Sequence, residues 1–381
     1  MKRVRRISDW VLASVDYDSG EICTHSQSCI WICGFSKLAD ALISGSKIHN
    51  QLGAQMLGVS YEEFNANAKQ RLNKLVRQAA KILNFAMPGG GGSVTTVQQQ
   101  RMQGPDTECA NGPHLVKNDN GDLVPGYHGF RFCIATSGAS YCGGDKIIRV
   151  YKGKEISPTC AECIECMVRL KKVWLNTWSE NEIYFQFIEH VEQYGQTVDA
   201  KMLDRWPWLK EIYHVGQQMG VGEVVQHFDG RVRGGAGYCA IANTYFQALL
   251  GTAAKRAMRK LTRECYDRTL KVPSMLYENS RKSVFAGVQS PLFGSHMVCF
   301  QHDELLPEIP RSMGHEGALR TSEVMEAELM MICPDIASAI KAPPSLMTRW
   351  NKAAEPVWHG GRLAIWTPEH DSKTCTECDH G

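Results

Sequence analysis

The 381-residue sequence lacks a long hydrophobic run. No stretch approaches the roughly 20 consecutive apolar residues that span a bilayer, so we expect no membrane span. The first apolar run, Trp10–Val15, is six residues long and ends at Asp16. It is too short for the hydrophobic core of a secretory signal peptide, which takes about 7 to 15 residues. The sequence therefore predicts a cytoplasmic protein.

An excess of charge of one sign is also lacking. The chain has 42 Lys and Arg against 40 Asp and Glu, a formal net charge of +2. Any nucleic-acid interface must therefore be local, and basic residues do cluster at residues 2–6, 231–233 and 255–263. The 43% hydrophobic content is ordinary for a globular protein, and the length predicts two or three subdomains.

Cysteine, in contrast, is abundant, with 15 residues. In a cytoplasmic protein these are expected to be thiols or metal ligands and not disulfides. Residues 98–158 are rich in Gly, Pro, Asn and Cys and have too little apolar periodicity for a core of their own. Four thiolates binding Zn²⁺ would explain how this insertion folds, and free thiols are the alternative. The four candidates are Cys133, Cys142, Cys160 and Cys163, with Cys166 nearby.

A second group of metal-ligand types lies at the C-terminus. It consists of Cys375, Cys378 and His380. A frayed chain end is the simpler interpretation of this segment.

Two cations and an aromatic ring recur with helical spacing in the first quarter of the chain. Arg77, Lys81 and Phe85 stand at i, i+4 and i+8, so a helix would place them in one stripe about 12 Å long. That length suits a nucleoside triphosphate, with its phosphates at the cations and its base toward the ring. An ordinary solvated helix face is the alternative. Pro88 and the four glycines after it predict the end of the helix.

Two carboxylates follow short apolar strands. Trp10–Val15 predicts a buried strand that ends at Asp16, and residues 296–306 predict a hairpin with His302, Asp303 and Glu304 at its tip. A carboxylate at the end of a buried strand is costly without a partner. If the two meet, they could hold two Mg²⁺ ions, but sequence spacing leaves this open.

Helical patterns account for much of the remaining chain. Ser60 and Glu63 form a capping box that predicts a helix start near Tyr61. Asn243 and Gln247 would share one face of a later helix. The predicted helical segments are residues 30–44, 163–194, 206–219 and 243–266, and residues 321–366 predict a helix followed by a loop.

In this order, the segments resemble the family A DNA polymerases, the relatives of bacterial DNA polymerase I. Asp16 and Tyr17, with Glu21, resemble motif A of that family. Arg77, Lys81 and Phe85 resemble motif B, and the His302-Asp303-Glu304 triplet resembles motif C. Residues 45–49 also agree, and residues 346–362 are similar to phage members in particular. The resemblance covers most of the chain except residues 98–158 and the C-terminal end.

The resemblance implies an α/β (α+β) fold, a polymerase palm with an antiparallel sheet and mostly helical fingers. The palm would comprise residues 1–33 and 231–381, and the fingers residues 34–230 with the cysteine-rich insertion at about 98–166. In the family, the exonuclease-like domain, the thumb and part of the palm precede motif A, whereas 15 residues do so here. We therefore expect a C-terminal subunit of a split polymerase, encoded by a phage in a bacterial host, with thumb and exonuclease on a separate polypeptide.

The resemblance also implies site residues. Asp16 and Asp303 would bind two Mg²⁺ ions, with Glu304 beside them as a further catalytic residue. The residues implied to bind the incoming nucleotide are Arg77, Lys81, Phe85, His49, Glu21 and Tyr17. Those implied to bind primer-template DNA are Asn243, Gln247, His302, Arg231 and Arg233. Glu21 would close the space under the 2′ position of the sugar, which implies a deoxynucleotide substrate.

Two positions depart from the family pattern. Asp18 and Ser19 stand where the family commonly has Ser and Gln, and Pro88 with its glycines replaces a Tyr-Gly pair. The aromatic group that flanks the templating base is thus absent from this helix. A single-subunit RNA polymerase or reverse transcriptase, and a non-catalytic nucleic-acid-binding subunit with the same fold, remain alternatives.

Overall fold

The chain is seen in a computed structural model that describes residues 9–102, 115–117, 123–125, 147–151, 153–272 and 288–368. It divides into two compact units. The sheet unit comprises residues 1–24 and 247–381, and the helical unit comprises residues 25–246. The divisions fall within α1 (Gly20–Cys33) and α11 (Tyr238–Tyr266), whereas the sequence analysis placed them after residues 33 and 230.

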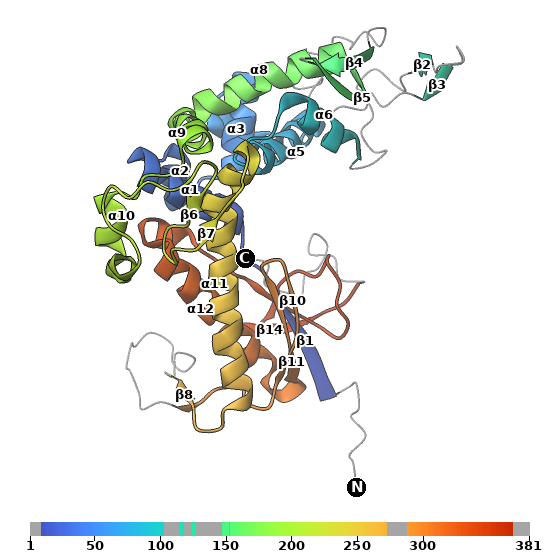
Figure 1. Cartoon of the computed structure of the whole chain (residues 1–381). Helices are drawn as coiled ribbons and strands as arrows, with labels where there is room; N and C mark the ends of the chain where they lie inside the picture. The colour runs from blue at the N-terminus through green and yellow to red at the C-terminus, as the bar shows by residue number, and fades with distance from the viewer. Residues whose placement is uncertain are drawn as a thin grey trace. The chain divides into compact units, whose positions relative to one another are not determined.

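A six-stranded sheet organises the sheet unit, in the order β10, β11, β1, β12, β14, β13. Figure 1 labels β1, β10, β11 and β14 of this sheet. Its strands are β1 (Trp10–Val15), β10 (His296–Gln301), β11 (Glu304–Pro310), β12 (Pro344–Met347), β13 (Val357–His359) and β14 (Arg362–Trp366). Neighbouring strands are antiparallel except β12 and β14, which are parallel. The structure therefore confirms the predicted fold class, a mixed α/β fold in which antiparallel pairing dominates.

Strand β1 lies between β11 and β12 and alternates in burial, as a strand covered mainly on one face does. Val11, Ala13 and Val15 are buried, and α12 (Gly314–Ile332) packs against this sheet. Ser14 lies on the opposite face and is only partly buried. The period of two thus sends Ser14, and Asp16 just beyond the strand, to the face away from the Val15 side chain.

The sheet unit has further short elements. Two 3-10 helices span Arg311–Met313 and Pro334–Ala339, and β8 (Lys271–Val272) pairs with β9 (Val288–Gln289). Within this unit, α11 and α12 are joined by a buried ion pair. Arg320 on α12 donates to both carboxylate oxygens of Glu264 on α11, at 3.0 and 2.7 Å.

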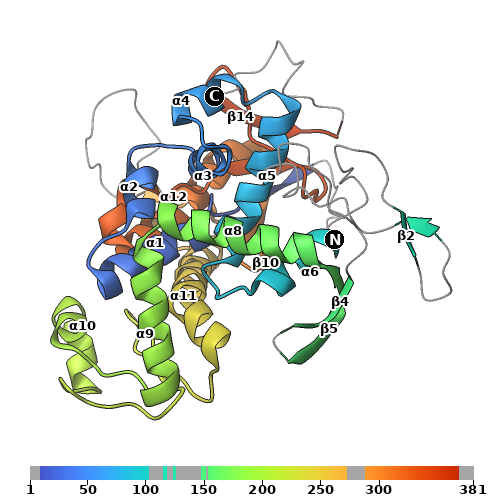
Figure 2. The same cartoon turned by 90° about the horizontal axis from the view of Figure 1, so that it is seen from above.

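Helices dominate the second unit, in which α3, α5 and α8 contact one another (Figure 2). Its helices, besides parts of α1 and α11, are α2 (Lys37–Ile43), α3 (Ile48–Leu57), α4 (Tyr61–Ala66), α5 (Arg71–Ala86), α6 (Ser93–Met102), α8 (Ala161–Thr177), α9 (Glu180–Tyr194), α10 (Ala200–Arg205) and a 3-10 helix at Pro207–Glu211. Trp174, Trp178, Tyr184 and Phe64 are fully buried and form part of its core.

The described part of the helical unit also contains three two-stranded sheets. They pair β2 (Leu115–Lys117) with β3 (Leu123–Pro125), β4 (Ile147–Tyr151) with β5 (Lys154–Cys160), and β6 (Val224–Val225) with β7 (Val232–Arg233).

Several predicted elements are confirmed. β1, the β10–β11 hairpin and α11 lie where the sequence predicts them, and α4 begins at Tyr61 with the Ser60 hydroxyl accepting from the Glu63 N–H at 3.1 Å. Others are wrong. The helix predicted for residues 30–44 is interrupted by Gly34, whose φ of 85° is left-handed. Residues 206–219 contain a 3-10 helix instead of an α-helix, and the loop predicted after α12 contains β12, β13 and β14.

The predicted zinc ligands cannot be placed together. Cys133 and Cys142 lie outside the described residues, as do the side chains of Cys160 and Cys163 and the whole group Cys375, Cys378 and His380. Cys166 is buried. Zinc binding therefore stays a prediction. In the part of the chain that is described, no helix is long and apolar enough to cross a membrane.

Candidate active site

Asp16 and Asp303 come together in the sheet unit. β1 and β11 are antiparallel, with Val15 paired to Leu305, so the residues just beyond this pair lie at one end of the sheet. Asp16 directly follows β1, and Asp303 lies in the two-residue turn between β10 and β11. The two carboxyl groups lie close enough for the charge of Asp303 to raise the pKa of Asp16. The structure thus joins two carboxylates that are far apart in the sequence.

The environment of this pair disfavours two negative charges. Burial, and then the charge of Asp303, raise the pKa of Asp16 to about 6. Burial, and secondarily the charge of Glu21, also raise the pKa of Asp303. Two carboxylates that share a half-buried site cannot both ionise at low cost unless a cation is present.

The Asp16–Asp303 pair fits divalent metal binding. Oδ1 of Asp16 is buried and has no hydrogen-bond partner among the described residues. Carboxylate oxygens are the donors that Mg²⁺ prefers, and a cation would satisfy this oxygen and relieve the repulsion. The described residues contain no group of three or more His, Cys, Asp or Glu side chains arranged around a metal position.

Glu304 is buried and occupied by three donors. Its Oε1 accepts from the Ser14 hydroxyl and from the Trp350 indole at 3.1 Å, and its Oε2 lies 3.5 Å from the Lys352 ammonium. Glu304 is thus held by protein partners and is not simply solvated. Because both of its oxygens are engaged, Glu304 is suited to holding the start of β11 in position next to Asp303.

Glu21 lies near the same end of the sheet unit, in the first turn of α1. Its Oε1 accepts from the side-chain amide of Gln247 at 3.2 Å, and burial raises its pKa. Gly20 makes this approach possible, because a Cβ there would lie 2.8 Å from Leu250 on α11. The structure therefore pairs Glu21 and Gln247, which the sequence analysis assigned to different ligands.

The side chain of Tyr17 points into the core. Its ring is 5% exposed, and its hydroxyl donates to the Met325 carbonyl of α12 at 2.8 Å. This side chain is thus held in the core, and the assignment of Tyr17 to nucleotide binding stays a prediction. Its hydrogen bond fixes the chain next to Asp16. The neighbouring Asp18 side chain is exposed.

His302 lies at the tip of the β10–β11 hairpin. It is exposed and has a left-handed φ of 56°, an uncommon conformation for a residue with a side chain. Together with Asp303 it forms a two-residue connection, because Gln301 pairs with Glu304. The tight connection explains the strained backbone at this position.

In the helical unit, the predicted stripe lies on α5. Arg77 and Lys81 are exposed, and Phe85 is partly buried. The Lys81 ammonium lies 6.0 Å from the centre of the Phe85 ring. The Arg77 Nε donates to Asn50 Oδ1 on α3 at 3.0 Å, which holds the guanidinium against this helix.

His49 on α3 joins the stripe. Its ring centroid is 5.8 Å from that of Phe85, and its Nδ1 lies 3.1 Å from the Asn84 side-chain amide. Burial, followed by the charges of Arg77 and Lys81, lowers the pKa of His49 to about 4. The structure thus brings together the four residues that the sequence analysis assigned to the triphosphate and base.

The glycine-rich segment after α5 packs closely on α11. α5 ends at Ala86, and a Cβ on Gly89 would lie 2.6 Å from Oδ1 of Asn243. The Asn243 amide donates to the Cys239 carbonyl at 2.7 Å and lies 3.4 Å from the Gly89 carbonyl. A tyrosine at position 89 would therefore not fit this packing, which gives a structural reason for glycine there.

The two arginines assigned to DNA lie on and beside strand β7. Both are exposed, and Arg231 forms an ion pair with Asp229 at 2.7 Å. Arg233 donates to the Thr244 hydroxyl at 3.0 Å. The basic residues 2–6 lie outside the described residues.

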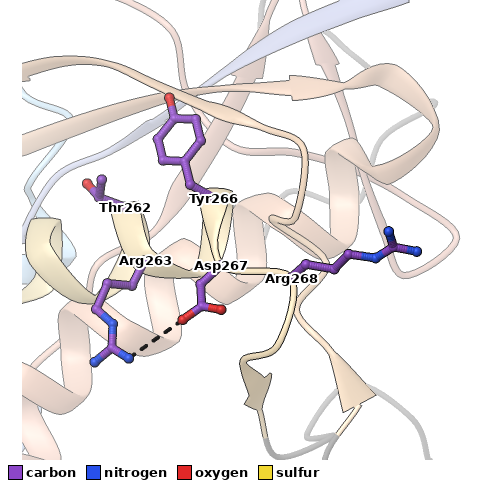
Figure 3. Close-up of a pocket in the computed structure, with 5 residues that line it drawn as sticks. All are labelled: Thr262, Arg263, Tyr266, Asp267 and Arg268. Carbon is purple, nitrogen blue, oxygen red and sulfur yellow. Dashed lines mark ion pairs between the residues drawn. The ribbon is translucent and has the colours of Figure 1, made fainter.

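A shallow pocket of about 450 Å³ lies at the C-terminal end of α11 and is separate from the predicted site (Figure 3). It is lined by Thr262, Arg263, Tyr266, Asp267 and Arg268. Arg263 pairs with Asp267 at 3.7 Å, whereas Tyr266 and Arg268 extend in other directions. None of the predicted site residues lines this pocket.

Sequence reasoning missed the residues that support the predicted ones. They are Ser14, Trp350 and Lys352 around Glu304, and Asn50, Asn84, Trp174 and Trp178 around the stripe. The role of Ser14 could have been predicted from the sequence, because Ser14 lies on the strand face that leads to Asp16. The roles of the two tryptophans could not, since about 90 residues separate them from Asn84.

No protein-family model matches the sequence, and no curated protein matches it. Among the solved structures that match is the "POL domain of Pol1 from M. smegmatis complex with DNA primer-template and dNTP", with a TM-score of 0.45 and 13% sequence identity. The match covers 88% of this chain and 39% of that chain, so this chain spans about two fifths of its length. Function is therefore inferred from the residues of this chain.

Proposed function

We propose that this chain carries out template-directed DNA synthesis, joining a deoxynucleotide to a primer 3′ hydroxyl with release of pyrophosphate. The observation that carries the proposal is the half-buried Asp16–Asp303 pair at one end of the sheet, in which Oδ1 of Asp16 has no hydrogen-bond partner among the described residues. The motif order that resembles family A DNA polymerases supports the same reaction.

In this proposal, Asp16 and Asp303 would hold two Mg²⁺ ions, which would supply charge neutralisation and a lowered pKa of the primer hydroxyl. The hydroxyl oxygen attacks the α-phosphorus, and the bond from that phosphorus to the pyrophosphate oxygen breaks. Glu304 keeps Asp303 in place through its bonds to Ser14 and Trp350. Most of the rate enhancement would come from positioning and from stabilising charge on the phosphates.

The α5 stripe would bind the incoming nucleotide. Arg77 and Lys81 would pair with the phosphates, and Phe85 would contact the base or sugar. Glu21, fixed by Gln247, would occupy the space under the 2′ position and exclude a ribose hydroxyl. Asn243, Gln247 and His302 would contact the minor groove, where acceptors common to all base pairs report geometry and not sequence. Arg231 and Arg233 would contact phosphates.

Primer extension by the full chain with Mg²⁺ tests the proposal. Asp16→Asn and Asp303→Asn should each lower kcat about 10³-fold or more, because each removes a ligand charge at the reacting phosphate. Asp335→Asn, which changes an exposed carboxylate of the same unit, should leave the rate unchanged. Equal activity of Asp303→Asn and the unchanged chain would instead favour a non-catalytic nucleic-acid-binding subunit.

Substrate choice separates the remaining alternatives. We expect deoxynucleotides to be incorporated much better than ribonucleotides, and Glu21→Ala to reduce this preference by relieving the contact with a 2′ hydroxyl. A preference for ribonucleotides would favour an RNA polymerase, and a preference for an RNA template would favour a reverse transcriptase. Processive extension by this chain alone would contradict the predicted separate thumb and exonuclease polypeptide.

A further inference from the structure

Four buried side chains form a hydrogen-bonded chain behind the α5 stripe. The indole N–H groups of Trp174 and Trp178 both donate to Oδ1 of Asn84, at 3.1 and 3.0 Å. The amide nitrogen of Asn84 lies 3.1 Å from Nδ1 of His49. The two tryptophans are fully buried, and Asn84 and His49 are 2% and 9% exposed. The chain runs from α8, with Trp178 directly after it, through α5 to α3.

The chemistry of the donors fixes the direction of every bond in this chain. An indole N–H only donates, so the atom of Asn84 that faces the tryptophans must be its carbonyl oxygen. Two donors use both lone pairs of that oxygen, and the NH₂ group is left to face His49. Because NH₂ only donates, Nδ1 of His49 must accept and cannot carry a proton. The proton of the neutral ring is therefore on Nε2.

The positive charges around His49 also favour the neutral ring. Arg77 and Lys81 lower its pKa, after burial, and a second ring proton on Nδ1 would meet the N–H of Asn84. The ring is thus a neutral donor beside two permanent cations. A neutral donor adds direction to phosphate binding, whereas an ordinary histidine would change its charge near pH 6.5.

We propose that Asn84, anchored by Trp174 and Trp178, locks His49 in the neutral Nε2–H form, so that His49 donates a pH-independent hydrogen bond to the phosphates of the incoming nucleotide. The role of the donor rests on the function proposed above, whereas the lock itself rests on geometry alone. Asn84, Trp174 and Trp178 are positioning residues, because they act through His49.

Asn84→Asp is the most direct test, since it preserves the shape and still accepts from both indoles. A carboxylate cannot donate to Nδ1, so it should draw a proton onto that nitrogen. Asn181→Asp is the matched control. Asn181 is also buried, and its Oδ1 lies 2.8 Å from Nε2 of the buried His25, outside the stripe.

The first readout needs no DNA and no nucleotide. In the ¹⁵N-histidine-labelled full chain at pH 7, two-bond ¹⁵N–¹H correlations should show His49 as the Nε2–H tautomer. With Asn84→Asp the ring should become doubly protonated or carry its proton on Nδ1, and with Asn181→Asp it should not change. A His49 that is charged, or protonated on Nδ1, in the unchanged chain would overturn the lock.

The second readout is the Kd for a deoxynucleoside triphosphate with Mg²⁺, measured by calorimetry on the full chain. If Asn84→Asp leaves the only ring proton on Nδ1, the donor is lost and binding should weaken about 10- to 100-fold, the usual effect of one hydrogen bond to a charged group. A doubly protonated ring keeps its Nε2–H and gains a positive charge, so binding should then tighten. Asn181→Asp should bind the nucleotide within about twofold of the unchanged chain. An altered tautomer with an unaltered Kd would overturn the donor role.

The two inferences can fail separately. If His49 is the Nε2–H tautomer but the chain neither binds the nucleotide nor extends a primer, the proposed function fails and the donor role with it. If the chain extends primers but His49 has the other tautomer, the lock alone fails. Should Asn84→Asp not fold, Trp178→Phe removes one anchor and should give a mixture of tautomers, whereas a single unchanged tautomer would contradict the anchoring role.

Discussion

At the scale of single residues, the clearest conflict between local preference and placement is His302. A left-handed backbone costs a residue with a Cβ about 1 to 2 kcal/mol, yet His302 keeps φ at 56° next to Asp303. Residues held in such conformations gather at functional sites, where the surrounding structure enforces them. The β10–β11 connection therefore places a histidine beside the carboxylate pair at a cost in stability.

We predict that His302→Gly stabilises the chain and weakens its interaction with DNA. Glycine removes the steric cost, so the free energy of unfolding should rise by up to about 1 kcal/mol. Urea unfolding measures this gain, and primer-template titration measures the loss of affinity. His302→Ala is the control, because it removes the imidazole but keeps the strain. An equal gain in both variants would contradict the role of the backbone.

The roles of some residues could be predicted from the pattern of the sequence segment in which they lie. Asp16 and Asp303 were predicted because each interrupts an apolar strand with a charge. Asn84 was not, because its role depends on Trp174 and Trp178, which approach it only when α8 packs on α5. The core position of the Tyr17 side chain was not predicted either, since the sequence does not show that its hydroxyl reaches the Met325 carbonyl.

At the scale of elements, the Glu264–Arg320 pair joins α11 and α12. Arg320 makes a two-pronged contact with Glu264, and the Ser290 hydroxyl donates to the same carboxylate at 2.7 Å. The side chains are 14% and 4% exposed, so solvent does little to screen them. A buried pair of this kind is costly to break on one side only, because the remaining charge is left without a partner.

We predict that Arg320→Met lowers the free energy of unfolding by about 3 to 5 kcal/mol, mostly from the stranded Glu264 carboxylate. Chemical unfolding followed by circular dichroism measures the loss. Adding Glu264→Gln to this variant should restore much of it, because the buried charge is then gone. On α11, Arg263→Met should lower the free energy of unfolding by about 0.5 kcal/mol or less, since the Arg263–Asp267 pair is exposed. A double variant no more stable than Arg320→Met would refute this account.

Local signals also decided which elements could be predicted. α4 was predicted from its capping box, and the hairpin from apolar runs on both sides of charged residues. β12, β13 and β14 have three to five residues each, and their stability comes from pairing within the sheet. Short strands of this kind have little periodicity to detect, so the part of residues 321–366 that follows the helix was predicted as a loop.

At the scale of the whole molecule, the described buried histidines are concentrated in the helical unit. Burial lowers the pKa of His25, His49 and His227 to about 4 each, although their partners differ. His25 contacts Asn181, and His227 stacks on Trp206 at 5.8 Å. In the sheet unit, His315 is only partly buried, and its pKa is lowered as well. The helical unit should therefore be the more sensitive to acid.

We predict that the helical unit loses stability as the pH falls from about 6.5 to about 4, while losing little above that range. In this window the unfolded chain binds protons on these histidines and the folded chain does not, so acid favours unfolding. Each group contributes about 1.4 kcal/mol per pH unit, so the three together give a slope of up to about 4 kcal/mol per pH unit. Hydrogen exchange by mass spectrometry resolves the helical unit from the sheet unit and measures each slope.

His227→Phe keeps an aromatic ring on Trp206 without a titrating group, and it should reduce the slope in the helical unit by about one third. A helical unit whose stability is the same at pH 4.5 and pH 6.5 would mean that these histidines are protonated in the folded chain, against their burial.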